Sequence, residues 1–595
     1  LTLSSLQHRP KDTKLPQLIG RTLIHQNALI NAVPYYLRKE IFASYQKDIA
    51  KLRKLKKTDF AKFNKLRLEL QNKVIPDSGD VAKDASFLHV ESIELNLPEV
   101  YFNEDGSLKE HGGMDIVVGN PPWDIWKANS DDFFSEYDND FRGLPNKRVK
   151  TERMKELFTN LSGLKDKWDA EQQRFKDGSK YFRSDNTYKY QRWTVNGRKT
   201  SSDLNLYKIS VERFAQLASS SARFSILVPD NFATDNGPTG IRHLVLDNYH
   251  LEEFLSFENR KSIFPAIDNR YKFAVLTFNY GDAEIDSFKA FFYRHSLDDL
   301  SNEEVKLNYP VDFIKQTEPE RYAFVEARTP ELFDLFKKIR TRFPDLNHTR
   351  LLKFSRDFDA NKESSKFIYK NDGESLISIY EGKTFNQFTI EPQKIKHYVT
   401  AEKMENKDNE DYKFPRLAFR GIASSTNKRS LIATLLPKNS SGTYSVWIQR
   451  NCEQTDIIHQ LFYLSFYNSY TLDFVIRQLV TININLPFSM QLPVPKYEDI
   501  PDAQKLIQIV KALLKENKGY YTDLDKLIPG DEYADKTHDA LIAELNARVM
   551  LDFDLTRDEV LTLMHTFESA KWKDFVEEET QRIVDVYDQL SAARK

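Results

Sequence analysis

The tetrapeptide Asn120-Pro121-Pro122-Trp123 has the residue types and spacing for chemistry on an exocyclic amine. Such an amine, as on adenine, is a poor nucleophile because its lone pair is delocalised into the ring. The side-chain oxygen of Asn120 and the carbonyl oxygen of Pro121 can accept hydrogen bonds from both N–H groups of the amine. The lone pair of the nitrogen then points toward an electrophilic methyl group. The two prolines fix the turn and supply no competing N–H. Trp123 offers a face for a base extruded from a duplex. The alternative is an ordinary proline-rich turn.

A strand must deliver this motif. The run Asp115-Ile116-Val117-Val118-Gly119 is apolar and β-branched, which predicts a buried parallel strand, with Asp115 shaping the turn rather than taking part in chemistry. Ligands of open α/β sheets bind beyond the carboxyl ends of their strands. Further elements are expected at 204–219 (helix) and Arg223–Val228 (strand), and then in a strand–turn–strand block over Leu251–Phe257 and Tyr271–Tyr280. This alternation predicts an α/β fold with a parallel sheet.

The sequence pattern of the rest of the chain changes from region to region. Residues 36–72 are predicted to be helical, and 124–202 form a long polar insertion with a helix near 147–176. From about 286 short strands and turns are expected, and from Pro501 to Lys595 the pattern is helical.

The composition excludes several classes. A chain of 595 residues predicts two to four domains. One cysteine, Cys452, excludes an internal disulfide framework and fits a reducing cytoplasm. No apolar run is long enough for a membrane span, and twelve scattered histidines without a cysteine partner set predict no metal site. The net charge of −2 does not indicate a nucleic-acid binder, so basic residues would have to cluster on one face.

The run from Asp115 to Trp123 resembles the catalytic motif of the amino-methylating DNA methyltransferases. More specifically, the chain is similar to the large adenine-specific enzymes of type IIG, type ISP and BREX-like bacterial defence systems from about residue 85 to 565. The stretches that carry this similarity are Ser202–Lys208 with Glu212–Phe214, Ser225–Pro229, Phe257–Lys261 with Ile263–Pro265 and Tyr271–Phe273, Arg416–Arg420 with Thr426–Arg429, and Leu492–Pro495.

The resemblance implies a Rossmann-like class I methyltransferase sheet, an α+β target-recognition domain and a helical C-terminal part. It implies methyl transfer from S-adenosylmethionine to N6 of a flipped adenine in double-stranded DNA, within a restriction-modification or phage-defence system. A nuclease or translocase region in the same or another chain is a further partner of such systems. The expected domains are a helical connector (1–75), a catalytic domain (76–285), a target-recognition domain (286–500) and a helical region (501–595).

The resemblance also implies roles for single residues. Asn120 and Pro121 would orient the amine, Pro122 would help to lock the turn, and Trp123 and Phe264 would stack on the target base. For DNA contacts, the segment Phe414–Arg429 is expected to supply phosphate and base-edge contacts, the alternative being an exposed turn between strands. The cations of this segment are Arg416, Arg420, Lys428 and Arg429, near Ser424, Ser425 and Thr426. The insertion Arg183–Arg198 could also close over DNA, or be an ordinary polar loop.

One feature of the family is missing from the sequence. The glycine-rich loop of the form Phe-x-Gly-x-Gly does not occur, and Gly112-Gly113 and Gly237 with Gly240 have the wrong spacing. Because residue 1 is Leu1 and not methionine, we expect a longer protein in which this loop precedes the chain, and a sheet that is incomplete on its N-terminal side. Two alternatives stay open: methylation of cytosine N4, and a DNA-binding specificity component without catalysis.

Overall fold

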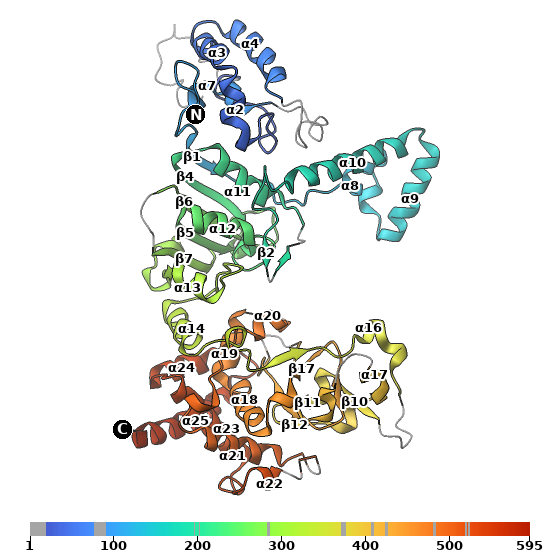
Figure 1. Ribbon diagram of the computed structural model, residues 1–595, viewed down its shortest axis with the longest axis vertical. Helices are drawn as coiled ribbons and strands as arrows, with labels where there is room; N and C mark the ends of the chain where they lie inside the picture. The colour runs from blue at the N-terminus through green and yellow to red at the C-terminus, as the bar shows by residue number, and fades with distance from the viewer. Residues whose placement is uncertain are drawn as a thin grey trace. The chain divides into compact units, whose positions relative to one another are not determined.

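The computed structural model describes residues 20–75, 91–195, 197–200, 203–281, 286–369, 376–405, 410–422, 427–479, 483–517, 520–521 and 524–594. The chain forms two compact units, Leu1–Phe324 and Val325–Lys595 (Figure 1). Each unit combines helices with strands, which confirms the prediction of an α/β protein. None of the helices in the described ranges has the length and apolar character needed to cross a membrane.

The first unit contains a helical N-terminal part, a sheet and a helical insertion. Its helices and strands are α2 (Arg38–Ala43), α3 (Gln46–Thr58), α4 (Phe60–Lys73), α6 (Ile93–Asn96), α7 (Pro98–Tyr101), β1 (Met114–Gly119), α8 (Ser130–Ser135), α9 (Lys147–Asn160), α10 (Leu164–Phe182), β2 (Thr194–Val195), β3 (Arg198–Lys199), α11 (Leu206–Leu217), β4 (Ala218–Pro229), α12 (Thr239–Asn248), β5 (His250–Glu258), β6 (Lys272–Asn279), β7 (Ser287–Arg294), β8 (Leu307–Pro310) and α13 (Val311–Thr317).

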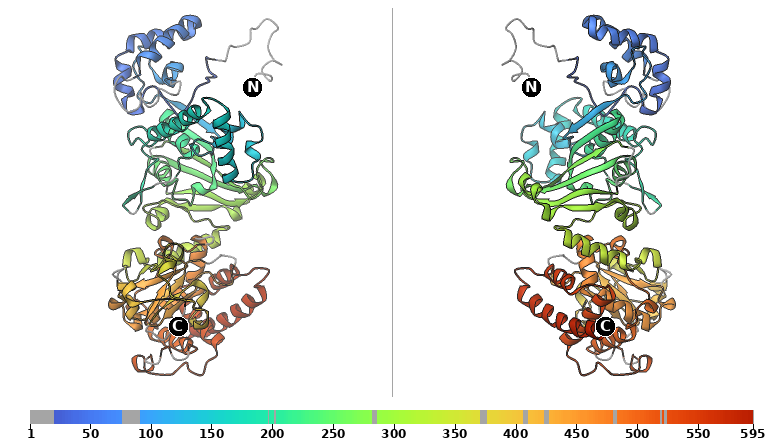
Figure 2. Two further views of the ribbon diagram at one scale, coloured as in Figure 1. Left: turned by 90° about the vertical axis from the view of Figure 1, so that its right-hand side faces the viewer. Right: turned by 90° about the vertical axis from the view of Figure 1, so that its left-hand side faces the viewer.

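The main sheet has the strand order β1-β4-β6-β5-β7-β8 over the described residues. Figure 1 labels its first five strands in this order, and Figure 2 shows the ribbon from two further sides. β1 pairs with β4, and β5 with β7, in parallel, whereas β6 is antiparallel to both of its neighbours. The prediction of a parallel sheet is therefore wrong, because the short connection after β5 returns β6 between β4 and β5 in the opposite direction. The carboxyl ends of β1, β4, β5 and β7 nevertheless share one end of the sheet.

Among the described residues β1 is an edge strand: it pairs in parallel with β4, as predicted, but the predicted burial is wrong. Ile116 and Val118 are 75% and 76% exposed. They pair with Arg223 and Ser225 of β4, so all four side chains stand on one face of the sheet. On the opposite face the alternate residues Phe224, Ile226 and Val228 are buried, and helices α11 and α12 contact β4 and β5. The strand is thus apolar on a side that the described residues leave open.

The insertion after the motif is a helical arm with its own small core. Phe134, Phe141, Leu157, Leu164 and Trp168 pack together between α8, α9 and α10, and Figure 1 shows these helices beside the sheet. The single helix predicted near 147–176 is therefore two helices, since the backbone turns at Gly163, whose φ is +76°. Trp126 ties the arm to the unit: its Nε1 donates to the carbonyl of Phe175 at 3.0 Å.

The second unit contains a four-stranded sheet of order β15-β14-β17-β9, and helices pack around this sheet. Its helices and strands are α14 (Pro330–Arg342), α15 (Leu346–Thr349), β9 (Lys353–Ser355), α16 (Ala360–Glu363), β10 (Ile377–Tyr380), β11 (Phe385–Asn386), β12 (Thr389–Ile390), β13 (His397–Val399), α17 (Ala401–Glu405), β14 (Arg416–Arg420), β15 (Ala433–Leu436), β16 (Ser440–Gly442), β17 (Val446–Arg450), α18 (Ile457–Tyr467), α19 (Tyr470–Leu479), α20 (Leu486–Ser489), α21 (Ala503–Leu514), α22 (Leu524–Leu527), α23 (His538–Asp552), α24 (Arg557–His565) and α25 (Lys573–Arg594).

The boundary between the units lies later than the sequence indicated. Strands β7 and β8 extend the main sheet past residue 286, so the first unit ends at Phe324. The region 501–595 is helical as predicted, but α21 packs on α18 and α23 packs on α19 within the second unit. It is therefore part of the same compact body as the mixed region before it.

A buried carboxyl group, Glu212 of α11, fixes the end of the insertion. Its oxygens accept hydrogen bonds from the backbone N–H of Tyr190 (3.1 Å) and from Nε2 of Gln191 (2.8 Å). Burial raises the pKa of Glu212 to about 7. The folded protein therefore binds this proton more tightly than the unfolded chain, and the resulting stabilisation is lost as the pH rises from about 4.5 through about 7.

We predict that Glu212→Gln removes this loss. The free energy of unfolding of the variant, relative to the wild type, should increase between pH 4.5 and pH 8 by up to about 3 kcal/mol. Urea denaturation at several pH values measures it, with Glu156→Gln, an exposed position on α9, as the control. Parallel pH curves for Glu212→Gln and the wild type would show that the burial of this carboxyl is not linked to stability.

Candidate functional site

The pairing of β1 with β4 sets the position of the motif. Gly119 lies opposite Ile226, so Asn120 leaves the sheet beside the last residues of β4. At the other end of the strand, a Cβ on Gly113 would lie 2.2 Å from the backbone carbon of Ala218. Only glycine therefore allows the two strands to approach each other there. Gly112-Gly113 thus has a packing role and does not form the glycine-rich loop of the family.

The four motif residues differ in exposure. Pro121 is buried, Asn120 and Pro122 are exposed, and Trp123 is partly buried. The indole ring of Trp123 stacks with the ring of Tyr271, with centroids 5.9 Å apart and planes inclined by 14°. Tyr271 is 47% exposed, so it forms the accessible side of this aromatic pair. The arrangement offers polar acceptors next to a stacking surface.

Tyr271 is a site residue that sequence reasoning did not single out. Phe264, the predicted stacking residue, packs edge-on against Phe273 at 4.9 Å, and Phe273 stacks on Phe257 at 5.3 Å. Both Phe264 and Tyr271 belong to the connection between β5 and β6. The available signal was an aromatic residue directly before a strand that begins beside the motif, but nothing local distinguishes it from its neighbours.

Asn259 holds this connection together. It is fully buried. Its Nδ2 donates to the carbonyls of Phe264 and Ile267, both at 2.9 Å, and its Oδ1 accepts from the N–H of Phe264 at 2.9 Å. Its own N–H donates to the carbonyl of Tyr271 at 2.9 Å. The side chain of Asn259 thus holds the backbone of Phe264, and its backbone N–H holds that of Tyr271.

Carboxylates at this end of the sheet are already engaged. Asp230 accepts from Lys272 at 3.1 Å, and Glu258 pairs with Arg260 at 2.9 Å and with His295 at 3.1 Å. Burial opposes ionisation of Glu258, but the hydrogen bonds from Arg260 and His295 prevail and lower its pKa. Cations therefore hold Asp230 and Glu258, whereas Asn120 and Pro121 offer neutral acceptor oxygens.

The described residues do not complete a pocket for S-adenosylmethionine. β1 has a paired strand, β4, on one side only, and Ile116 and Val118 beside the motif are exposed. No glycine-rich turn follows a strand that neighbours β1 in the described part of the chain. These residues supply hydrogen-bond acceptors and stacked rings at the carboxyl end of β1.

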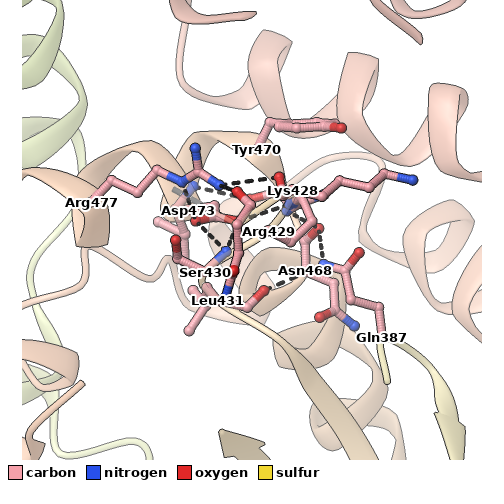
Figure 3. A network of polar contacts seen from close by, with 12 residues as sticks. Gln387, Lys428, Arg429, Ser430, Leu431, Asn468, Tyr470, Asp473 and Arg477 are labelled. Carbon is pink, nitrogen blue, oxygen red and sulfur yellow. Dashed lines mark hydrogen bonds and ion pairs between the residues drawn. The ribbon is translucent and has the colours of Figure 1, made fainter. Parts of the chain in front are cut away.

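Two of the predicted DNA contacts are buried, which corrects their assignment. The guanidinium of Arg416 is fully buried and pairs with Asp357, with Nη1 at 2.8 Å from Oδ2. Arg429 donates from Nε to Asp473 at 2.7 Å and from Nη2 to the carbonyl of Asn468 at 2.7 Å (Figure 3). In sequence both look like surface cations, but each neutralises a buried carboxylate and cannot reach DNA in this fold.

The other two predicted contacts are partly buried. Nζ of Lys428 lies 3.1 Å from the ring centroid of Phe575, and burial lowers its pKa. Arg420 donates from Nη2 to Oδ1 of Asn386 at 2.6 Å. Ser424, Ser425 and Thr426, expected beside these cations, lie outside the described residues.

The insertion Arg183–Arg198 is anchored by a series of rings. Trp193 stacks on His243 with centroids 4.4 Å apart, and His243 stacks on Tyr322 at 3.7 Å. Nδ1 of His243 lies 3.0 Å from Asp247. Tyr188 is buried in the core of the unit. These aromatic residues are therefore packing residues, which leaves the hairpin β2–β3 on the surface.

Comparisons with known proteins give a limited answer. No protein-family model and no curated protein matches the chain. Among solved structures, it is 12% identical to the type IIG restriction endonuclease BpuSI over 66% of this chain and 50% of that one, with a TM-score of 0.26. It is 10% identical to the type IIL restriction-modification enzyme MmeI in complex with DNA over 66% and 54%, with a TM-score of 0.32.

A third solved structure is the ATP-dependent type ISP restriction-modification enzyme LlaBIII bound to DNA. It is 10% identical over 68% of this chain and 30% of that one, with a TM-score of 0.26. The chain thus spans about half the length of the first two proteins, 50% and 54%, and less of the third. At TM-scores this low the likeness carries no argument about activity, and the function rests on the site itself.

We predict that Asn259→Ala loosens the loop between β5 and β6. The carbonyls of Phe264 and Ile267 and the N–H of Phe264 lose their side-chain partner, which should accelerate tryptic cleavage at the exposed Arg260, Lys261 and Arg270 at least about tenfold. The control is Asn231→Ala, since Asn231 is exposed and bonds only to nearby Asp235. Equal cleavage rates in the wild type and Asn259→Ala would refute the positioning role.

A second prediction concerns the buried pair Arg416–Asp357. Arg416→Met should lower the free energy of unfolding by about 3–5 kcal/mol, because it leaves a buried carboxylate with one cation fewer. The double variant with Asp357→Asn should recover part of this loss, as urea denaturation can measure. A stable Arg416→Met protein with weakened DNA binding would instead restore Arg416 as a DNA contact.

Proposed function

We propose that this chain carries the methyl-acceptor site and the target-recognition part of a DNA methyltransferase that modifies N6 of adenine. The observation that carries the proposal is the acceptor pair Asn120 and Pro121 at the carboxyl end of β1, beside the stacked rings of Trp123 and Tyr271. Neutral oxygens and an aromatic surface suit an amine on a planar base.

In this proposal the side-chain oxygen of Asn120 and the carbonyl oxygen of Pro121 each accept one hydrogen bond from the amine N–H groups. The nitrogen lone pair then leaves the plane of the ring and faces the methyl group. The exposed side chain of Asn120 can reach a base, while the buried Pro121 and the second proline hold the carbonyl still. Fixed acceptors need no rearrangement as charge develops on the nitrogen, which is the main source of electrostatic catalysis.

Trp123 and Tyr271 together form the surface on which the extruded adenine stacks, with Tyr271 as its accessible ring. Phe264 remains a candidate contact, because Asn259 fixes it in the same loop as Tyr271. A base must leave the duplex for its amine to be reached. Stacking on an aromatic side chain stabilises such a base by about 1–3 kcal/mol.

S-adenosylmethionine is the methyl donor that the sequence resemblance implies. The substrate is double-stranded DNA of a specific sequence, and we assign its recognition to the second unit. The resemblance also places the protein in a restriction-modification or phage-defence system, with a nuclease or translocase region as a partner. Methylation of cytosine N4 fits the same two acceptors, and a binding-only specificity component would need neither of them.

We predict that Asn120→Ala lowers methyl transfer about 10²–10³-fold, the effect of removing one preorganised polar group in comparable sites. The assay is mass spectrometry of nucleosides from the DNA of cells that carry the altered gene. Asn129→Ala is the control, because Asn129 also follows β1 but only caps α8. N4-methylcytosine in wild-type DNA would support the cytosine alternative, and wild-type levels of N6-methyladenine with Asn120→Ala would refute the acceptor role.

A further inference from the structure

Arg356 of the second unit lies at one end of the four-stranded sheet. It directly follows β9, which pairs with β17 through Ser355 and Ile448. Trp447 is the preceding residue of β17, and it pairs with Phe419 near the end of β14. Three adjacent strands thus bring together Arg356, Trp447 and Gly421, which directly follows β14.

Two aromatic rings support the guanidinium of Arg356. Its Cζ lies 3.7 Å from the ring centroid of Tyr444 and 4.1 Å from that of Trp447. Trp447 is itself fixed, since its Nε1 donates to the carbonyl of Ile484 at 2.7 Å. A Cβ on Gly421 would lie 3.2 Å from Nε1 of Trp447 and 3.5 Å from Nη2 of Arg356. The guanidinium is therefore held in a defined orientation.

Arg356 has no hydrogen bond or ion pair with another of the described residues, and its buried Nε lacks a hydrogen-bond partner among them. Other arginines of this unit contrast with it: Arg416 pairs with Asp357, Arg429 with Asp473, and Arg450 with Asp411. Stacking satisfies the face of a guanidinium but not its N–H edge. Unlike these three arginines, Arg356 therefore has no carboxylate partner for its N–H donors among the described residues.

We propose that Arg356 is a DNA-recognition residue that donates to a pair of acceptors on duplex DNA. Such a pair is either O6 and N7 of guanine or two oxygens of a phosphate. Tyr444, which is 51% exposed, would widen the contact surface beside it. Because the two rings already fix the side chain, binding costs little side-chain entropy. This inference rests on the proposed function. It adds a DNA-recognition residue that the sequence did not indicate.

The test is selection of bound sequences from a randomised duplex library by the purified wild type, Arg356→Lys and Arg356→Ala. If Arg356 reads guanine, both variants should lose preference at one G·C position by about ten- to a hundredfold. If it binds phosphate, Arg356→Ala should weaken all sequences alike and reduce the slope of log affinity against log salt by about 0.9. Either result supports the site and identifies the acceptor.

Two further variants complete the design. Arg557→Lys changes an exposed arginine that pairs with Asp588, and should match the wild type. Tyr444→Ala keeps the guanidinium but removes one supporting ring, so it should lower the affinity about threefold to tenfold, in proportion to a stacking contact. It also tests the site if Arg356→Ala does not fold.

The inference is overturned if both Arg356 variants keep the affinity, the salt slope and the selected sequence of the wild type. It is also overturned if the wild type binds no duplex. Failure of the proposed function has a different signature: no methylated base in wild-type DNA, whatever the effect of Arg356 on binding. Loss of methylation with Asn120→Ala, together with an unchanged selected sequence, would separate the two sites.

Discussion

The parallel pairing between β1 and β4 is the contact on which the candidate site depends. β1 has a neighbouring strand on one side only among the described residues, so these hydrogen bonds alone set its register in the sheet. A shift by one residue would reverse the faces of Ile116 and Val118 and turn Asn120 away from its present direction. Gly113 allows the pairing to begin, because any side chain there would collide with the backbone of Ala218.

Other residues at this end of the sheet complete the candidate site around Asn120 and Pro121. Asn259 fixes the loop that brings Tyr271 onto Trp123, and ion pairs neutralise the acidic groups around it. A site made of neutral acceptors and aromatic rings can hold an uncharged base amine through hydrogen bonds and stacking. The face of β1 that carries Ile116 and Val118 is apolar and exposed.

In the second unit, the placement of carboxylates decides the role of each arginine. A cation beside a buried acid, such as Arg416 or Arg429, stabilises the fold and is unavailable to a ligand. Arg356 is stacked on aromatic rings instead, and it pairs with no carboxylate among the described residues. The whole-chain charge of −2 therefore says little about DNA binding, because many cations are paired with acids within the fold.

The sequence by itself determined the features that depend on neighbouring residues: the α/β class, the helical C-terminal region, and the strand that leads into Asn120-Pro121-Pro122-Trp123. Apolar runs, proline locks and turn residues act within a few positions, so their meaning can be read locally. Only the tertiary structure decided that β1 is an edge strand, that Tyr271 rather than Phe264 meets Trp123, and that Arg416 and Arg429 are buried. The physical reason is that these properties depend on partners far away in the chain: Asp357 lies 59 residues before Arg416, and no local pattern encodes that distance.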